Sequence, residues 1–179
     1  MEAFQPWLVH TLASAKPVAQ IMRTKWGWPT CESLHFLGLS MLIGCIGAFD
    51  LRLLGLAKRI PIIALHRLIP WGISGYVLNM LTGSMFLMTE PDQYIYNPSF
   101  HFKILFMILA GLNVLVFYTI VFRKVKVLEV GADAPLLGKF IGGASLFFWI
   151  AIIVCGRLLT FYRPGRCSGV PTFPFDCVP

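Results

Sequence analysis

Apolar residues dominate four long stretches of the chain, and short polar or basic segments separate them. The apolar stretches are about 32–56, 62–88, 100–122 and 136–162, each of roughly the length that an α-helix needs to cross the hydrocarbon core of a bilayer. This pattern predicts an all-α integral membrane protein, a four-transmembrane-helix bundle. We expect residues 1–179 to form a single membrane domain.

The first 28 residues show a different pattern. Apolar side chains recur at helical spacing from Trp7 to Met22, with basic residues between and after them. This pattern predicts an interfacial amphipathic helix over 1–28, bent or broken at Pro17. The segment has no basic start, compact apolar core or small-residue cleavage site, so a removable signal peptide is not expected.

Composition supports the prediction of a membrane protein and affects how the positive net charge is interpreted. Hydrophobic residues make up 57% of the chain and charged residues only 13%, while the formal net charge is +7. In a membrane protein, an excess of Lys and Arg first marks topology and contacts with lipid headgroups. We therefore expect the lipid bilayer as a partner and no binding of nucleic acid.

Basic residues gather in the turns that follow the first and third apolar stretches, whereas the loop 89–99 has no Lys or Arg. The positive-inside rule places both basic turns in the cytoplasm. It therefore predicts that both termini, the loop 89–99 and a tail over 163–179 lie on the outer side. Cys167 and Cys177 of that tail are compatible with a disulfide in an oxidising compartment.

Two histidines lie at the same predicted depth in the bundle. His35 is about one turn inside the outer end of the first stretch, and His101 is about one turn inside the outer end of the third. Imidazoles at one level on two helices can ligate a low-spin b-type haem, with the porphyrin slotted between the helices. His35 and His101 are therefore candidate metal ligands for one haem b.

Four further residues have places in this haem hypothesis. Gly38 lies one turn below His35 on the same helix face and would leave room for a flat macrocycle. Lys103 and Arg157 lie at a similar outer level and are candidates to pair with the haem propionates. Glu32, three residues before His35, is a candidate acceptor for its other ring nitrogen.

Other interpretations of the same residues stay open. Each histidine could simply hydrogen-bond a neighbouring helix, as polar side chains in membrane bundles do. The histidines together with Met85, Met88 and Met107 would also suit Cu(I), which prefers thioether and imidazole ligands. Methionine equally fills membrane cores without a metal. Copper is thus the alternative to haem.

A second polar group is predicted at the inner ends of the first two stretches. It comprises Asp50, Arg52, His66 and Arg67, with a contact from Asp50 to His66 or Arg67. Because this layer holds only one histidine, a second bis-histidine haem is not expected. The group is interpreted as a surface cluster that anchors helix ends and binds lipid headgroups.

Three strings, ESLHFLGLSMLIGCIGAFDLRLLG, TGSMFL and NPSFHFKILFMILAGLN, resemble an uncharacterised bacterial family of small multi-pass membrane proteins. That family is distantly similar to the copper-resistance D type and to small b-type cytochromes. The resemblance covers about residues 28–122, and its most specific part is the combination of Glu32, His35, Asp50 and Arg52. It implies the bacterial inner (cytoplasmic) membrane, so that the outer side is the periplasm, and four or five helices, but no established reaction.

These observations predict a b-type cytochrome-like electron-transfer protein, or a subunit of a larger redox complex. It would pass electrons between quinone and a periplasmic or membrane partner. No catalytic nucleophile, acid pair or nucleotide loop is visible, so an independent enzyme is not expected. A cofactor-free accessory subunit of a membrane complex is an alternative of a different class, and a copper-handling protein is a third.

Overall fold

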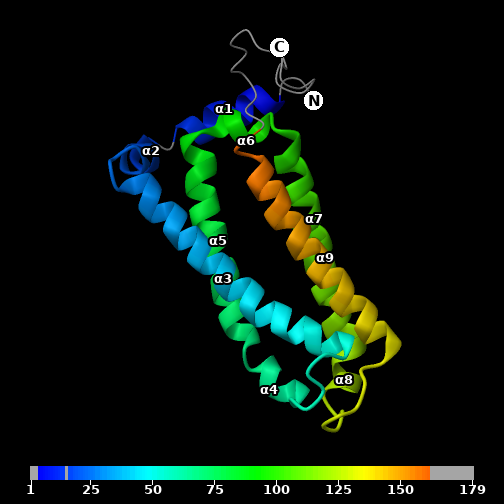
Figure 1. Cartoon of the computed structure of the whole chain (residues 1–179). Helices are drawn as coiled ribbons and strands as arrows, with labels where there is room; N and C mark the ends of the chain where they lie inside the picture. The colour runs from blue at the N-terminus through cyan, green and yellow to red at the C-terminus, as the bar shows by residue number, and fades with distance from the viewer. Residues whose placement is uncertain (1–3, 15, 162–179) are drawn as a thin grey trace.

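The computed structural model describes residues 4–14 and 16–161, and this part of the chain is helical, without strands. The helices are α1 (Phe4–Ala13), α2 (Lys16–Met22), α3 (Gly27–Leu54), α4 (Ile62–His66), α5 (Ile69–Thr89), α6 (Pro91–Ile95), α7 (Pro98–Val116), α8 (Phe122–Val125) and α9 (Leu136–Leu158). Figure 1 shows the long helices α3, α5, α7 and α9 between an end with α1 and α6 and an end with α4 and α8. The predicted tail and its two cysteines lie outside the described residues.

Three segments of the described chain are long and apolar enough to cross a membrane: Gly27–Leu54, Pro98–Val125 and Leu136–Leu158. The second is α7, continued through a π-helical turn, Phe117–Val121, into α8. The all-helical, membrane-spanning character predicted from the sequence is therefore confirmed. The predicted number of four spans is not confirmed, because α5 is 21 residues long but polar and small residues interrupt its apolar sequence.

Glycine and proline determine several helix ends. These ends differ from the ones that the apolar pattern predicted. α3 ends before Gly55, whose φ of 103° is left-handed and lets its N–H cap the last turn. The predicted stretch 62–88 is broken between α4 and α5, because Pro70 lies in the first turn of α5 and cannot continue a preceding helix. α9 ends at Leu158 rather than at 162.

The N-terminal segment forms two helices, where the sequence predicted an interfacial helix that is bent or broken at Pro17. α1 ends at Ala13 and α2 begins at Lys16, and Pro17 lies in the first turn of α2, where its missing N–H costs little. α1 packs against α5 and α6, and α2 packs against α3 and α5, where Met22 is buried. The segment therefore covers one end of the α3–α5 pair (Figure 1), and its amphipathic, interfacial character stays a prediction.

Glycines allow the closest helix contacts in the bundle. α3 packs against both α5 and α9, and α7 packs against α9. A Cβ atom on Gly38 would lie 2.8 Å from the carbonyl oxygen of Gly75 and 2.7 Å from Nδ2 of Asn79, so α3 and α5 meet with their backbones in contact. A Cβ on Gly142 of α9 would lie 3.0 Å from the carbonyl oxygen of Asp50. Small residues thus hold α3 between α5 and α9.

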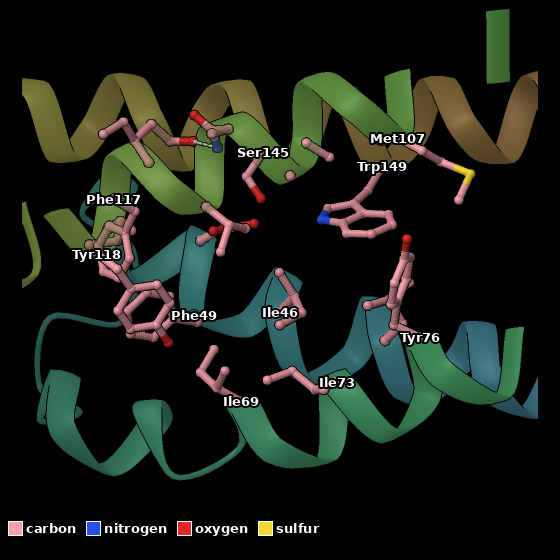
Figure 2. A pocket seen from close by; sticks show the side chains of 18 residues that line it. Ile46, Phe49, Ile69, Ile73, Tyr76, Met107, Phe117, Tyr118, Ser145 and Trp149 are labelled. Carbon is pink, nitrogen blue, oxygen red and sulfur yellow. Dashed lines mark hydrogen bonds between the residues drawn. The ribbon is translucent and has the colours of Figure 1, made fainter. Parts of the chain in front are cut away.

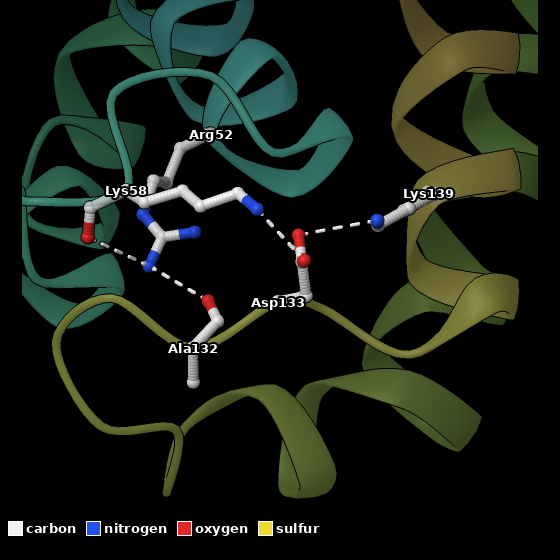
Figure 3. A network of polar contacts seen from close by, with 5 residues as sticks. All are labelled: Arg52, Lys58, Ala132, Asp133 and Lys139. Atoms are coloured by element: carbon white, nitrogen blue, oxygen red, sulfur yellow. Dashed lines mark hydrogen bonds and ion pairs between the residues drawn. The ribbon is translucent and has the colours of Figure 1, made fainter.

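Arg52 joins two loops at the α4–α8 end of the bundle (Figure 3). The residue is 1% exposed, and its guanidinium donates to the carbonyl oxygens of Ile60 at 2.9 Å, Lys58 at 3.3 Å and Ala132 at 3.3 Å. Ile60 and Lys58 precede α4, whereas Ala132 precedes α9. A single side chain of α3 therefore connects the loop before α4 to Ala132, which lies 80 residues after Arg52 in the sequence.

Asp133 forms the exposed part of the same loop contact. Its carboxylate pairs with Lys58 at 2.7 Å and with Lys139 at 3.1 Å (Figure 3). The hydrogen bonds from Lys58 and Lys139 hold the pKa of this carboxyl below its usual range. The network places Lys58, from the loop before α4, and Lys139, from the first turn of α9, around one acid, and it fixes the start of α9 relative to the end of α3.

Candidate functional site

A pocket of about 270 Å³ lies between the α3–α5 pair and the α7–α9 pair (Figure 2). α3 and α9 form its back, and α5 and α7 form its sides without packing extensively against each other. Ile73 on α5 and Val114 on α7 both line the pocket, yet they are 54% and 43% exposed. The pocket therefore opens sideways between α5 and α7.

Asp50 brings a carboxyl group to the back wall of this pocket. The residue is 4% exposed, and its Oδ2 atom has no hydrogen-bond partner among the described residues. Ser145 of α9 is a hydrogen-bonding neighbour of the carboxyl. The predicted contact from Asp50 to His66 or Arg67 is wrong, because His66 bonds Tyr118 and Arg67 is exposed. A buried carboxyl oxygen without a partner is costly, which makes Asp50 a candidate binding residue.

Trp149 supplies a second unpartnered polar atom, its indole Nε1. The residue is 9% exposed and lies one helical turn after Ser145 on the same side of α9. Figure 2 shows the indole extending into the pocket with its nitrogen directed to the side where Ser145 lies. Within the described part of the chain, one cavity thus holds an indole N–H without an acceptor and a carboxyl oxygen without a partner.

Aromatic rings form much of the remaining wall. Tyr76 meets Trp149 edge to face, with ring centroids 6.0 Å apart and an interplanar angle of 71°. Phe49 meets Phe117 in the same manner, at 5.4 Å and 82°. Apolar and aromatic walls with a few polar atoms are the usual lining of sites for small lipophilic molecules.

The side wall formed by α7 includes an irregular turn. The π-helical turn Phe117–Val121 begins at the pocket, and such turns recur at functional sites. Within it, the hydroxyl of Tyr118 hydrogen-bonds Nε2 of His66 at 3.1 Å. One turn earlier, Nδ2 of Asn113 donates to the carbonyl oxygen of Ile141 at 3.0 Å. These two hydrogen bonds therefore attach the end of α7 and the π-helical turn to α4 and to α9.

His35 lies apart from the pocket, where α3 meets α5. Its Nδ1 atom is 2.7 Å from Oγ1 of Thr82, whose hydroxyl donates to the carbonyl oxygen of Leu78 at 2.8 Å. The threonine oxygen therefore accepts the Nδ1 proton, and this tautomer leaves the Nε2 lone pair available. Metal-ligating histidines show this arrangement, and so do histidines that only join two helices.

The described residues show no direct contact between His101 and His35. His101 is an exposed residue of α7, and no hydrogen bond or ring contact joins the two imidazoles in the described part of the chain. The face of Gly38 that was expected to admit a macrocycle is filled by Gly75 and Asn79 of α5. The space expected beside Gly38 is therefore occupied by α5, and the ligand pair remains a prediction.

The charged candidates differ in exposure and in the residues that they contact. Glu32 is exposed, and Thr82 occupies the place at a His35 ring nitrogen that was expected for Glu32. Lys103 is half-buried against α9, with its Nζ 3.7 Å from the position of a Cβ on Gly156, and Arg157 is exposed. Over residues 4–14 and 16–161, no group of three or more His, Cys, Asp or Glu could hold a metal ion.

No protein-family model matches the chain, and no curated protein and no solved structure matches it. The candidate site therefore rests on this chain's own residues. The sequence interpretation missed it, because Asp50 was assigned to a surface cluster and Ser145 and Trp149 were not singled out. A usable signal was present, since Gly142, Ser145 and Trp149 recur at intervals of three and four residues on one buried face of α9.

Proposed function

We propose that the protein is a membrane-embedded binding protein that takes a small lipid-soluble molecule into the pocket between its two helix pairs. The observation that supports this most directly is the presence of two buried, unpartnered polar atoms, Asp50 Oδ2 and Trp149 Nε1, in walls that are otherwise mainly apolar. Buried polar groups in native proteins normally have partners, and ionisable groups inside a membrane usually serve a function. A ligand with complementary polar groups would supply the missing partners.

In this proposal α5 crosses the membrane as a fourth span beside α3, and the opening between α5 and α7 faces lipid. The α4–α8 end carries an excess of basic side chains, among them Lys58, Arg59, Arg123 and Lys124. The positive-inside rule assigns such an end to the cytoplasm. The α1–α6 end and both termini then face the periplasm of a bacterial inner membrane, and the ligand enters sideways from the bilayer.

Filling the pocket tests the proposal. Gly111 lines the pocket and Gly44 lies on α3 outside it, and a Cβ atom at either position would meet nothing within 4 Å. Gly111→Leu and Gly44→Leu therefore add the same side chain to open positions on two helices. Only the leucine at position 111 takes up space in the pocket, so the second variant is a matched control.

The measurement is photolabelling of the purified protein in lipid nanodiscs by a small aryl diazirine, with the label located by mass spectrometry of peptides. We expect saturable label on peptides that carry Tyr76 or Trp149, lost in Gly111→Leu and retained in Gly44→Leu. Label that spreads over lipid-facing residues without saturation, or that Gly111→Leu leaves unchanged, would contradict a binding pocket.

The predicted electron-transfer role is a second candidate, favoured by the bond from His35 to Thr82, which leaves Nε2 of His35 available to a metal. Reduced-minus-oxidised visible spectra of the wild type, His35→Ala and His101→Ala test it. A sharp alpha band that both substitutions abolish would support haem b. A featureless spectrum from folded protein made with ample haem would oppose it, and metal analysis would then separate a copper-handling protein from a cofactor-free accessory subunit.

A further inference from the structure

We infer that the ligand of this pocket is a lipid-soluble ring compound of the hydroquinone or phenol class, with a hydroxyl that donates to Asp50 and an oxygen that accepts from Trp149. The inference rests on the proposed binding function and adds to it the chemical class of the ligand. It follows from the two unpartnered atoms, from the aromatic walls and from the position of the opening.

The polar atoms of the pocket define what the ligand must offer. The Trp149 indole can only donate, and the unpartnered Oδ2 of Asp50 accepts when the carboxyl is ionised or carries its proton on Oδ1. No Lys, Arg or His lines the pocket within the described chain, so no side chain there neutralises the carboxyl. A carbonyl or ether oxygen would satisfy Trp149 alone, and an ammonium group would satisfy Asp50 alone. A hydroxyl is the simplest neutral group that both donates and accepts.

The walls favour a flat ring over a plain alkyl alcohol. Tyr76 and Trp149 stand edge to face on one side, and Phe49 and Phe117 do so on another, so a third ring would find both faces and edges to pack against. The volume of about 270 Å³ lies near the lower limit of small-molecule sites and suits one substituted ring. A tail on that ring would leave through the sideways opening and remain in the bilayer.

Three probes with the same short alkyl tail test the class: a hydroquinone kept reduced, its dimethyl ether, and a benzylammonium ion. Affinities are measured by isothermal titration calorimetry in detergent. We expect the hydroquinone to bind about tenfold more tightly than the ether, because only its hydroxyl donates to Asp50. Equal binding of the ether, tighter binding of the ammonium ion, or binding of none of the three would overturn the class. The photolabelling experiment does not depend on these affinities, and its result decides the proposed binding function separately.

Two substitutions should change the affinities of these probes in different ways. Asp50→Leu removes the acceptor and should abolish the preference for the hydroquinone over the ether. Trp149→Phe keeps a ring but removes the N–H, and should weaken both probes by a similar factor of about ten while the preference remains. A preference that survives Asp50→Leu, or affinities that Trp149→Phe leaves unchanged, would overturn the inference.

Matched controls separate these effects from general damage to the fold. Trp71 on α5 is 63% exposed and outside the pocket, and Asp92 on α6 is exposed. Trp71→Phe and Asp92→Leu should therefore leave all three affinities unchanged. If Asp50→Leu does not fold, the probe series on the wild type and the conservative Trp149→Phe variant still decide the inference.

Discussion

Nδ1 of His35 and the hydroxyl oxygen of Thr82 lie 2.7 Å apart, which joins α3 to α5 by a side-chain hydrogen bond inside the bundle. Thr82 is 3% exposed, so its removal leaves the imidazole proton without access to water at that site. Thr82→Val keeps the branched shape and deletes the acceptor. We expect it to lower the free energy of unfolding by about 1–2 kcal/mol, measured by denaturant titration in mixed micelles.

Thr119→Val is the control for the loss of unfolding free energy expected of Thr82→Val. Thr119 is exposed, and its hydroxyl donates to the carbonyl oxygen of Leu115 at 2.8 Å, as that of Thr82 donates within its own helix. The control therefore removes a local bond but no contact between helices. Equal destabilisation by the two substitutions would show that the bond to His35 contributes nothing.

The close approach of α3 and α5 gives a second prediction. Gly38→Ala places a methyl group 2.8 Å from the carbonyl oxygen of Gly75, and backbone cannot yield as a flexible side chain can. We expect a loss of about 1–3 kcal/mol in the free energy of unfolding, because the two helices must separate. Gly44→Ala adds the same methyl to an open position of α3 and should cause no loss in the same assay. A stable Gly38→Ala variant would mean that these helices do not meet at this point.

Arg52 gives a third prediction, at the other end of the bundle. Arg52→Met keeps the aliphatic length but leaves the carbonyl oxygens of Ile60 and Ala132 without this donor. We expect a loss of about 1.5–3 kcal/mol, and Arg52→Lys should not restore it, since one ammonium group cannot replace the planar fork. Arg59→Met, at an exposed position of the same loop, should be neutral. Restoration by lysine would contradict the geometry described.

The sequence predicted the helical membrane class because long apolar runs are a local property, readable residue by residue. It predicted a bend or break near Pro17, and Arg52 as part of a polar group, for the same reason. The partner of Arg52 was not predictable, since Ala132 lies 80 residues away and only the fold brings the two loops together. The pocket was missed because it forms only where two helices meet: Trp149 on α9 and Asp50 on α3 line the same cavity. Helical spacing indicates which residues share a face but not which helix lies opposite.

The Asp133 carboxylate makes stability depend on pH. Its folded-state pKa lies below the unfolded value of about 3.9, because Lys58 and Lys139 stabilise the charged form. Its ion pairs therefore contribute stability above that value, and the contribution is lost as pH falls through the depressed folded pKa. We expect the difference in unfolding free energy between the wild type and Asp133→Asn to be constant near neutral pH and to shrink below about pH 4. High salt should reduce the difference as well, because the pairs are exposed.

The proposed topology predicts opposite accessibility for the two ends of α5. Arg59 lies before α4 and Asp92 lies in α6, so α4 and α5 separate these exposed positions. In Asp92→Cys, a membrane-impermeant maleimide should label the new cysteine in cells whose outer membrane alone is permeabilised. In Arg59→Cys, label above the background of the native cysteines should appear only after lysis. The reverse pattern would invert the orientation derived from the basic turns. Labelling of both positions from one side would show that α5 does not cross the membrane, and the opening between α5 and α7 would then no longer face lipid.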